Sequence, residues 1–268
     1  MSSPRNFKMH DAKVLAAGYS RGMRIFEIAS IATFAIGMVM VAYRLGVQLD
    51  RYWWLALAAA MTGFLAADFI SGFVHWMCDT WGRLDMPVVG KALLRPFREH
   101  HVNPKAITEH DFIETNGLNC WISTPGILLI AFVSPIGPWS FFGLATMMFT
   151  LLFVLLTNQA HKWAHMDTPP GYIAFLQRMG LLLPPGHHSV HHTQPFNRYY
   201  CITVGWLNRP LQYVQFFQTL ERIITATTGA MPRKDDIGEL AARMMAEAAE
   251  REAAEAAAEA EVNAATTR

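Results

Sequence analysis

The sequence predicts an all-α, polytopic integral membrane protein with four transmembrane helices and a histidine-rich helical cap on the cytosolic side. Long apolar runs and one long uncharged interval predict the helices, and clustered histidines predict the cap. The 268 residues are 52% hydrophobic with a mean hydropathy of +0.19, which is too apolar for an ordinary soluble domain. A formal net charge of +1 gives no basic field, so nucleic acid is not expected as a partner.

A membrane-spanning helix needs about 20 mostly apolar residues. The first two runs meet this requirement directly, and only Asp68 interrupts the second. Residues 115–160 contain no Lys, Arg, Asp or Glu, and the turn SPIGP at 134–138 divides this interval into two further spans. The four predicted spans cover about residues 25–45, 53–78, 119–134 and 139–160.

The cationic residues orient these spans. Five precede the first span, two lie in the first loop, five follow the second span, none lies in SPIGP and ten follow the fourth span. By the positive-inside rule both termini and the loop 79–118 are cytosolic, in a bacterial inner membrane or, for a eukaryotic chain, the endoplasmic reticulum. The predicted parts are an N-terminal cytosolic segment 1–24, a membrane domain 25–232 and an Ala/Glu-rich tail 233–268.

Two amphipathic segments follow the fourth span. Gly171–Leu183 is too short to cross a bilayer and is bracketed by prolines, so we expect a helix lying on the membrane face. Arg209–Thr228 is expected to form a second amphipathic helix near that surface.

In this topology ten of the eleven histidines fall at or beside the cytosolic ends of spans, whereas His10 is expected to be an ordinary surface residue. His75 and Asp79 are four residues apart, so one helical face carries both. His161 and His165 repeat that spacing at the end of the fourth span. With the motifs REHH and HHSVHH, nine candidate ligands result: His75, Asp79, His100, His101, His161, His165, His188, His191 and His192.

A lone histidine near a helix end is most often a hydrogen-bonded side chain, but clustering changes this interpretation. The four imidazoles of HHSVHH would repel one another when protonated and would lose solvation when buried in the neutral form, so metal ligation is the economical account. One zinc ion needs four ligands, whereas two ions of higher coordination number use about nine. The count favours a dinuclear site.

Several nearby polar residues have two interpretations. Asp79 could cap its helix or pair with Arg83, but an acid at a helix C-terminus opposes the dipole, which favours the ligand role. Asp68 lies seven residues before His75 and is expected to orient that imidazole rather than bind metal. His110 and His187 are either additional ligands or ordinary polar side chains.

Four long motifs, in order along residues 68–232, resemble the plasmanylethanolamine desaturases, the lipid desaturase family that includes bacterial CarF. They are DFISGFVHWMCDTWG, RPFREHHVNPKAITEHDFIETNG, LTNQAHKWAH and HHSVHHTQPFNRYYCITVGWLNRPL. A more distant member is the plant plastid enzyme that desaturates palmitate on phosphatidylglycerol. The box at His188 is also similar to that of acyl-CoA desaturases, although Phe97 and Asp79 stand where those enzymes have histidines.

The resemblance implies an enzyme, an iron-dependent membrane desaturase that converts the alkyl chain of an ether phospholipid into the vinyl ether of a plasmalogen. It implies two Fe ions, O2 as co-substrate and two electrons, with the nine candidate ligands in matching positions. A saturated carbon beside an ether oxygen has no acidic proton, so acid–base catalysis alone cannot remove two hydrogens from it. Two irons with imidazole and carboxylate ligands can activate oxygen to the oxidant this reaction needs.

The electrons must come from an external donor. The chain has no dinucleotide-binding glycine loop, no haem-attachment motif and no iron–sulfur cysteine set. We expect a ferredoxin or a cytochrome b5-type protein to dock on the cytosolic face, steered by loop cations. These cations are Arg83, Lys91, Arg95, Arg98 and Lys105.

Three other functions stay open: a phospholipid-linked acyl desaturase of the plastid type, a metal transporter and a non-enzymatic metal-binding regulator. A transporter should carry polar ligands deep within several spans, whereas residues 118–157 contain no histidine or charged side chain. A regulator has no need of nine ligands. The acyl desaturase would act at a similar depth, and only the closer motif resemblance favours the alkyl ether substrate.

Overall fold

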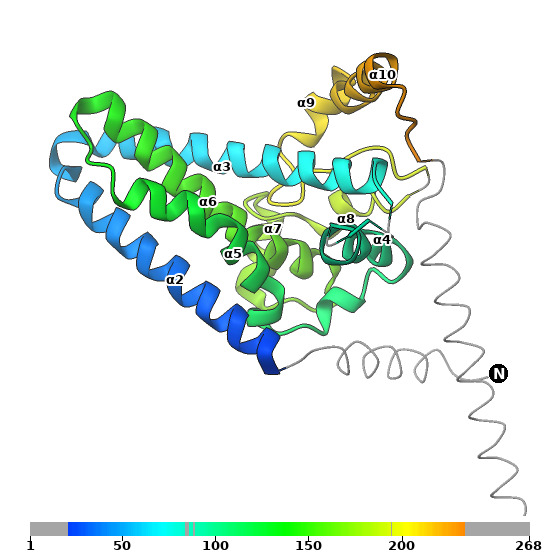
Figure 1. Ribbon diagram of the computed structural model, residues 1–268, viewed down its shortest axis with the longest axis horizontal. Helices are drawn as coiled ribbons and strands as arrows, with labels where there is room; N and C mark the ends of the chain where they lie inside the picture. The colour runs from blue at the N-terminus through cyan, green and yellow to red at the C-terminus, as the bar shows by residue number, and fades with distance from the viewer. Residues whose placement is uncertain (1–20, 84–85, 88, 194, 234–268) are drawn as a thin grey trace, which may run out of the picture. The chain divides into compact units, whose positions relative to one another are not determined.

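The computed structural model describes residues 21–83, 86–87, 89–193 and 195–233, and every regular element in these residues is helical (Figure 1). The chain forms two compact units. The first comprises residues 1–76 and 105–223, and the second comprises residues 77–104 and 224–268. His10 and nearly all of the predicted tail lie outside the described residues.

Three helices are long and apolar enough to cross a membrane: α2 (Arg21–Gly46), α3 (Leu49–Thr80) and α6 (Gly137–His165). They correspond to the first, second and fourth predicted spans. Each extends a few residues beyond the apolar run, because the helical backbone continues into the polar residues at the membrane boundary. Near its start α3 contains one non-helical residue, Tyr52, with φ −125° and ψ 24°.

The third predicted span, 119–134, overlaps helix α5 (Phe112–Ala131), which begins seven residues before the predicted span and ends three residues before its end. Asp111 sets this start, because its carboxylate accepts from the backbone N–H groups of Ile113 and Glu114. Arg24 of α2 forms an ion pair with the same carboxylate at 2.6 Å, and together these contacts lower the pKa of Asp111 to about 2. Hydropathy alone missed the first two turns of α5 because they are polar.

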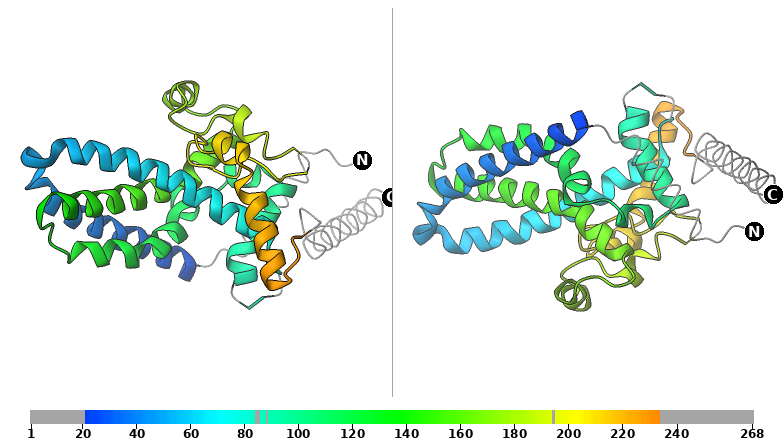
Figure 2. Two further views of the ribbon diagram at one scale, coloured as in Figure 1. Left: turned by 90° about the horizontal axis from the view of Figure 1, so that it is seen from above. Right: turned by 90° about the horizontal axis from the view of Figure 1, so that it is seen from below.

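Helices α2, α3, α5 and α6 of the first unit run alongside one another as two hairpins (Figures 1 and 2). Their core contains Phe34, Ile127 and Phe141, each at most 1% exposed. At the hairpin ends, Arg44 donates to the Ala131 carbonyl and to Ser134, and so ties the two connecting turns together. The opposite ends of α3 and α6 carry the histidines.

The remaining helices are short. The second unit contains η1 (Gly90–Leu94) and α4 (Arg95–Val102), and the first contains η2 (Ala106–Thr108), α7 (Gly171–Arg178), α8 (Pro185–His188) and α9 (Asn208–Tyr213). The predicted surface helix 171–183 is therefore confined to its first two turns. The predicted single helix 209–228 was wrong: α9 ends before Val214, and α10 (Phe216–Thr228) starts after Gln215, whose φ of 50° interrupts the helix.

Gly63 lets α3 approach the backbone of α6. A Cβ at this position would lie 2.8 Å from the Thr150 nitrogen and 2.9 Å from the Thr146 oxygen, so Gly63→Ala forces the helices apart. We expect a loss of about 1–3 kcal/mol of stability, measured by thermal unfolding in detergent. Gly143→Ala in α6 is the control, because a Cβ there meets nothing within 4 Å. Equal unfolding temperatures for the two variants would contradict this packing.

Candidate metal centre

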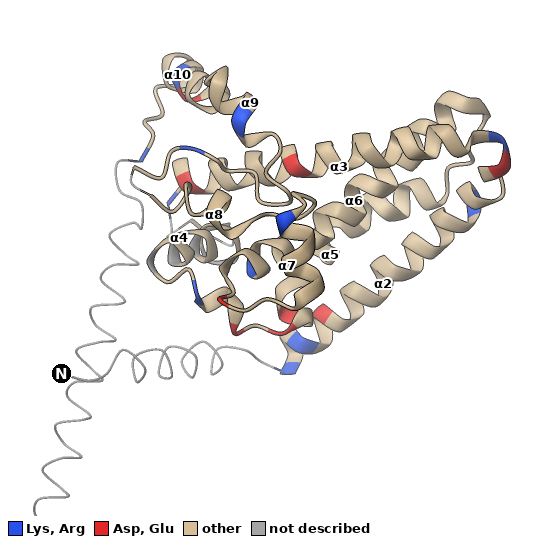
Figure 3. Ribbon diagram, turned by 180° about the vertical axis from the view of Figure 1, so that it is seen from behind, with Lys and Arg blue, Asp and Glu red and all other residues tan. Residues whose placement is uncertain are grey.

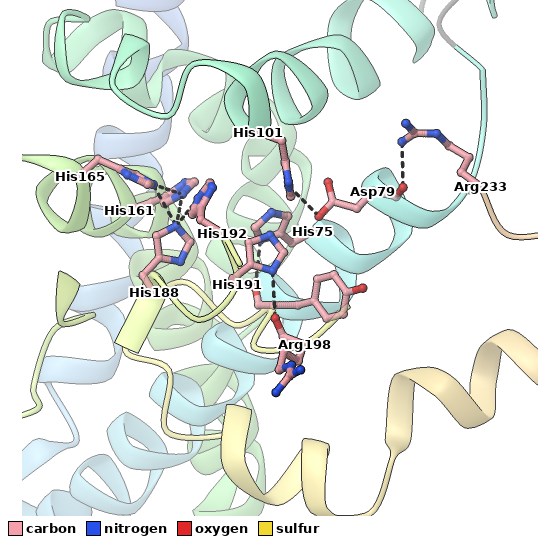
Figure 4. Close-up of polar contacts among 11 residues, drawn as sticks. His75, Asp79, His101, His161, His165, His188, His191, His192, Arg198 and Arg233 are labelled. Carbon is pink, nitrogen blue, oxygen red and sulfur yellow. Dashed lines mark hydrogen bonds and ion pairs between the residues drawn. The ribbon is translucent and has the colours of Figure 1, made fainter. Parts of the chain in front are cut away.

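Four imidazoles of the first unit converge through their Nε2 atoms (Figure 4). His161 and His165 lie one turn apart at the end of α6, so they share a face of that helix. His188 ends α8, and His192 follows in the next turn. The Nε2 atom of His188 lies 2.9 Å from that of His161, 2.9 Å from that of His165 and 3.0 Å from that of His192.

Hydrogen bonding accounts for only part of this geometry. A neutral imidazole nitrogen offers either one proton or one lone pair, so Nε2 of His188 can form one of its three short contacts as a hydrogen bond. A cation bound by all four nitrogens would account for every contact. Two nitrogens that are each about 2.1 Å from one ion lie about 3 Å apart when their bonds are at right angles, which matches the observed spacing. The residues fit a metal ion.

A second pair of imidazoles, His75 of α3 and His191, lies beside this group. Their ring centroids are 4.3 Å apart, and the ring of His75 is centred 6.0 Å from that of His161. Both side chains are fully buried. Nδ1 of His75 lies 3.1 Å from the Tyr200 carbonyl and Nδ1 of His191 lies 3.0 Å from the Arg198 carbonyl.

These carbonyls decide which ring nitrogen can bind metal. A carbonyl only accepts, so each Nδ1 carries the proton and donates it, and Nε2 keeps the lone pair. This arrangement is typical of histidines that bind metal through Nε2. Backbone atoms therefore orient His75 and His191 so that Nε2 of each could bind a metal ion.

The hydrogen bonds of Asp68 link it to His75 through the loop of residues 200–207. Its Oδ1 accepts from the N–H groups of Val204 and Gly205, and its Oδ2 accepts from that of Leu207. The carboxylate thus anchors the loop that also carries Tyr200, the residue whose carbonyl orients His75. Three N–H donors satisfy a fully buried carboxylate in α3 without a metal ion.

The second unit holds the other three predicted ligands. In α4, His100 and His101 are adjacent, and Nε2 of His101 lies 3.2 Å from Oδ2 of Asp79. The side chains of Asp79 and His101 are 11% and 2% exposed. Arg233 binds the chain near Asp79, since its guanidinium donates to the Asp79 carbonyl and its backbone N–H donates to the Thr80 carbonyl.

The two ambiguous histidines lie outside the groups that could hold a metal ion in the described part of the chain. His110 faces Glu114, with Nε2 and Oε1 3.7 Å apart. His187 accepts from the side-chain amide of Asn208 at 3.1 Å, and burial, together with the charge of Arg209, lowers the pKa of its imidazole. The neutral imidazole of His187 is therefore suited to packing against its neighbours and to accepting a hydrogen bond.

The sequence did not reveal the roles of Arg198, Tyr200 and Asn208. The first two act through main-chain carbonyls, which any residue type supplies, so no side-chain pattern marks them. Asn208 is buried and bonds both the N–H and the carbonyl of Cys201. All three lie within the motif that begins with HHSVHH, which located the loop but not its function.

Comparison with known proteins places the chain in a family. Plasmanylethanolamine desaturase of Myxococcus xanthus is 55% identical over 91% of this chain and 87% of its own length. Plasmanylethanolamine desaturase 1 of Mus musculus is 42% identical over 84% of this chain and 86% of its own. Chloroplastic fatty acid desaturase 4 of Arabidopsis thaliana is 35% identical over 65% of this chain and 53% of its own.

No solved structure matches the chain. The lipid desaturase domain matches residues 64–235, which include every candidate ligand and well over half of the chain. The protein therefore belongs to the lipid desaturase family.

Proposed function

We propose that the protein is a membrane di-iron desaturase that introduces the vinyl ether double bond into the sn-1 alkyl chain of an ether phospholipid, converting plasmanylethanolamine to plasmenylethanolamine. The convergence of four imidazoles beside the pair His75 and His191 carries this proposal, because it is a ligand set for more than one ion. The names of the relatives at 55% and 42% identity support the substrate.

The proposed ligands are the six histidines of the first unit together with Asp79, His100 and His101. His75 and His191 offer only two nitrogens, and Asp79 follows His75 by one turn of the same helix. Asp79 is hydrogen-bonded to His101, so this pair would offer the metal an imidazole as well as a carboxylate. A mixed imidazole and carboxylate set suits iron that reacts with oxygen.

The reaction balances with one O2, two electrons and two protons. The alkyl chain gives up two hydrogens and gains the double bond, and the four hydrogens and O2 leave as two water molecules. When bound, the two irons supply the oxidising power that breaks the C–H bonds. The protein's own groups hold the imidazoles in place: the carbonyls of Tyr200 and Arg198 keep the protons on Nδ1 of His75 and His191.

We further propose four spans, with α5 as the third and the site on the cytosolic side. The charged residues of the first unit lie mainly toward the ends of its long helices (Figure 3). Helix α5 buries polar residues such as Asn116 against its neighbours and exposes apolar ones such as Ile122 and Leu129, as a lipid-facing helix does. Histidines at the ends of α3 and α6 would meet lipid carbons near the headgroup.

An external ferredoxin or cytochrome b5-type protein is the proposed electron donor. Of the cations expected to steer it, Arg83 is exposed, whereas the side chains of Lys91, Arg95 and Arg98 lie outside the described residues. Lys105 has another role: its ammonium group donates to the His165 carbonyl at 2.8 Å and pairs with Asp167. These contacts hold the chain after α6.

Ligand substitutions test the metal site. We expect purified protein to hold two irons, measured by mass spectrometry of the metals. His188→Ala, His191→Ala and Asp79→Ala should each lower iron affinity or product formation by about 10- to 100-fold, because each removes a ligand. His110→Ala is the matched control, since its ring faces Glu114 outside the clusters. Wild-type rates in His191→Ala would refute the assignment.

The product tests the substrate. Cells that express the chain and receive 1-alkyl ether phospholipid should release long-chain aldehydes when their lipids are treated with mild acid, because vinyl ethers hydrolyse and acyl-chain alkenes do not. His191→Ala cells are the control. A new acyl alkene without aldehyde would point to the acyl desaturase, the reaction in the name of the 35% identical relative. Bound metal with no change in any lipid would point to a transporter or regulator.

Cysteine labelling tests the topology. The native residues Cys78, Cys120 and Cys201 are all buried, so background labelling should be low. Glu109 and Val47 are exposed at opposite ends of the first unit's helices, and a cysteine at each reports one side. We expect an impermeant reagent added outside intact cells to label Val47→Cys and to spare Glu109→Cys until the membrane is opened. The reverse pattern would invert the proposed orientation.

A further inference from the structure

The loop that follows HHSVHH holds two aromatic residues in the left-handed backbone region. Phe196 has a φ of 59° and Tyr199 a φ of 61°. A bulky side chain in this region costs on the order of 1–3 kcal/mol and persists only where the surroundings enforce it. The position of Tyr199 is informative, because it lies between Arg198 and Tyr200, the residues whose carbonyls accept from His191 and His75.

The φ rotation of Tyr199 is one of the four backbone rotations between the Arg198 and Tyr200 carbonyls, and it is the one held in the left-handed region. These two carbonyls must reach two imidazoles whose centroids are only 4.3 Å apart. Both do so, with oxygen–Nδ1 distances of 3.1 Å for His75 and 3.0 Å for His191. An extended φ at Tyr199 would turn one carbonyl away from its imidazole, so the strained conformation serves both contacts.

The ring of Tyr199 is held by His187. The two rings stack with centroids 4.7 Å apart and planes 25° apart. Asn208 fixes His187 through its amide and also bonds both backbone groups of Cys201, which follows Tyr200. Gly205 packs against the same imidazole, because a Cβ at Gly205 would lie 2.8 Å from a ring carbon of His187. The imidazole that stacks on Tyr199 is therefore itself held by Asn208 and Gly205.

We propose that Tyr199 and His187 form a positioning clamp that keeps His75 and His191 in the Nδ1-protonated tautomer by aiming the carbonyls of Arg198 and Tyr200. His187 thus acts as a stacking partner and not as a metal ligand, although it belongs to the HHSVHH motif. The inference rests on the proposed two-ion site, but it does not depend on the lipid that the enzyme desaturates.

The test is a Co2+ titration of metal-free protein in detergent, followed by the visible absorption of the bound ions. The wild type should bind two Co2+ ions. Tyr199→Ala removes the stacked ring, and we expect it to weaken one ion by about 10- to 100-fold while the ion of the four converging imidazoles is retained. Tyr199→Phe should behave as the wild type, because stacking needs only the ring.

Two further variants separate the clamp from general loop stability. His187→Ala should cause the same loss as Tyr199→Ala, and the double variant should be no worse than either single one, because both act on one contact. Phe196→Ala removes the other left-handed aromatic residue and should retain both ions. Unfolding temperatures of all variants report whether the loop has loosened.

Wild-type affinity for both ions in Tyr199→Ala would overturn the clamp, and so would an equal loss of both ions or the same loss in Phe196→Ala or Tyr199→Phe. Fewer than two Co2+ ions in the wild type would overturn it together with the dinuclear site. Two bound ions with no vinyl ether product in cells would remove only the proposed reaction and leave the clamp standing.

Discussion

The structure around the histidines depends on keeping several buried imidazoles uncharged. Six histidines of the first unit are packed at the ends of α3 and α6, and His75, His188 and His191 are at most 1% exposed. Protonation would set like charges a few ångströms apart in a medium of low polarity, and the neutral rings need partners for their nitrogens. Bound metal ions would meet both requirements, because they accept the nitrogen lone pairs of neutral rings.

Backbone groups orient two of these six imidazoles, those of His75 and His191. The carbonyls of Arg198 and Tyr200 fix two tautomers, and the loop that carries them is fixed in turn by Asp68 and by Ser71, whose hydroxyl accepts from Ile202 N–H. One helix, α3, supplies Asp68, Ser71 and His75 within three turns. It therefore provides a proposed ligand and also the anchors of the loop that orients this imidazole.

The sequence predicted the helical class and located the helices of the three most apolar spans, because hydropathy and length determine these features directly. It also grouped His161 with His165 correctly, since helical periodicity places residues four apart on one face. It could not predict where α5 begins or that residues 209–228 contain a break at Gln215, because a side-chain cap and a single positive φ decide these points. The partner of His75 was missed for a similar reason: a main-chain carbonyl leaves no pattern in the residue types.

The position of Asp68 has a consequence for how the protein is made. Its three hydrogen-bond donors lie 136 to 139 residues further along the chain, beyond α6. When α3 enters the bilayer during synthesis, its carboxylate has none of these donors, and a charged group inside a transmembrane helix is costly until it finds partners. These donors, on Val204, Gly205 and Leu207, are made only after α5 and α6, so the carboxylate would lack them until that part of the chain has been synthesised. The packing around α3 is thus complete only when this late loop is in place, and a chain truncated before Val204 would retain a buried carboxylate without these three donors.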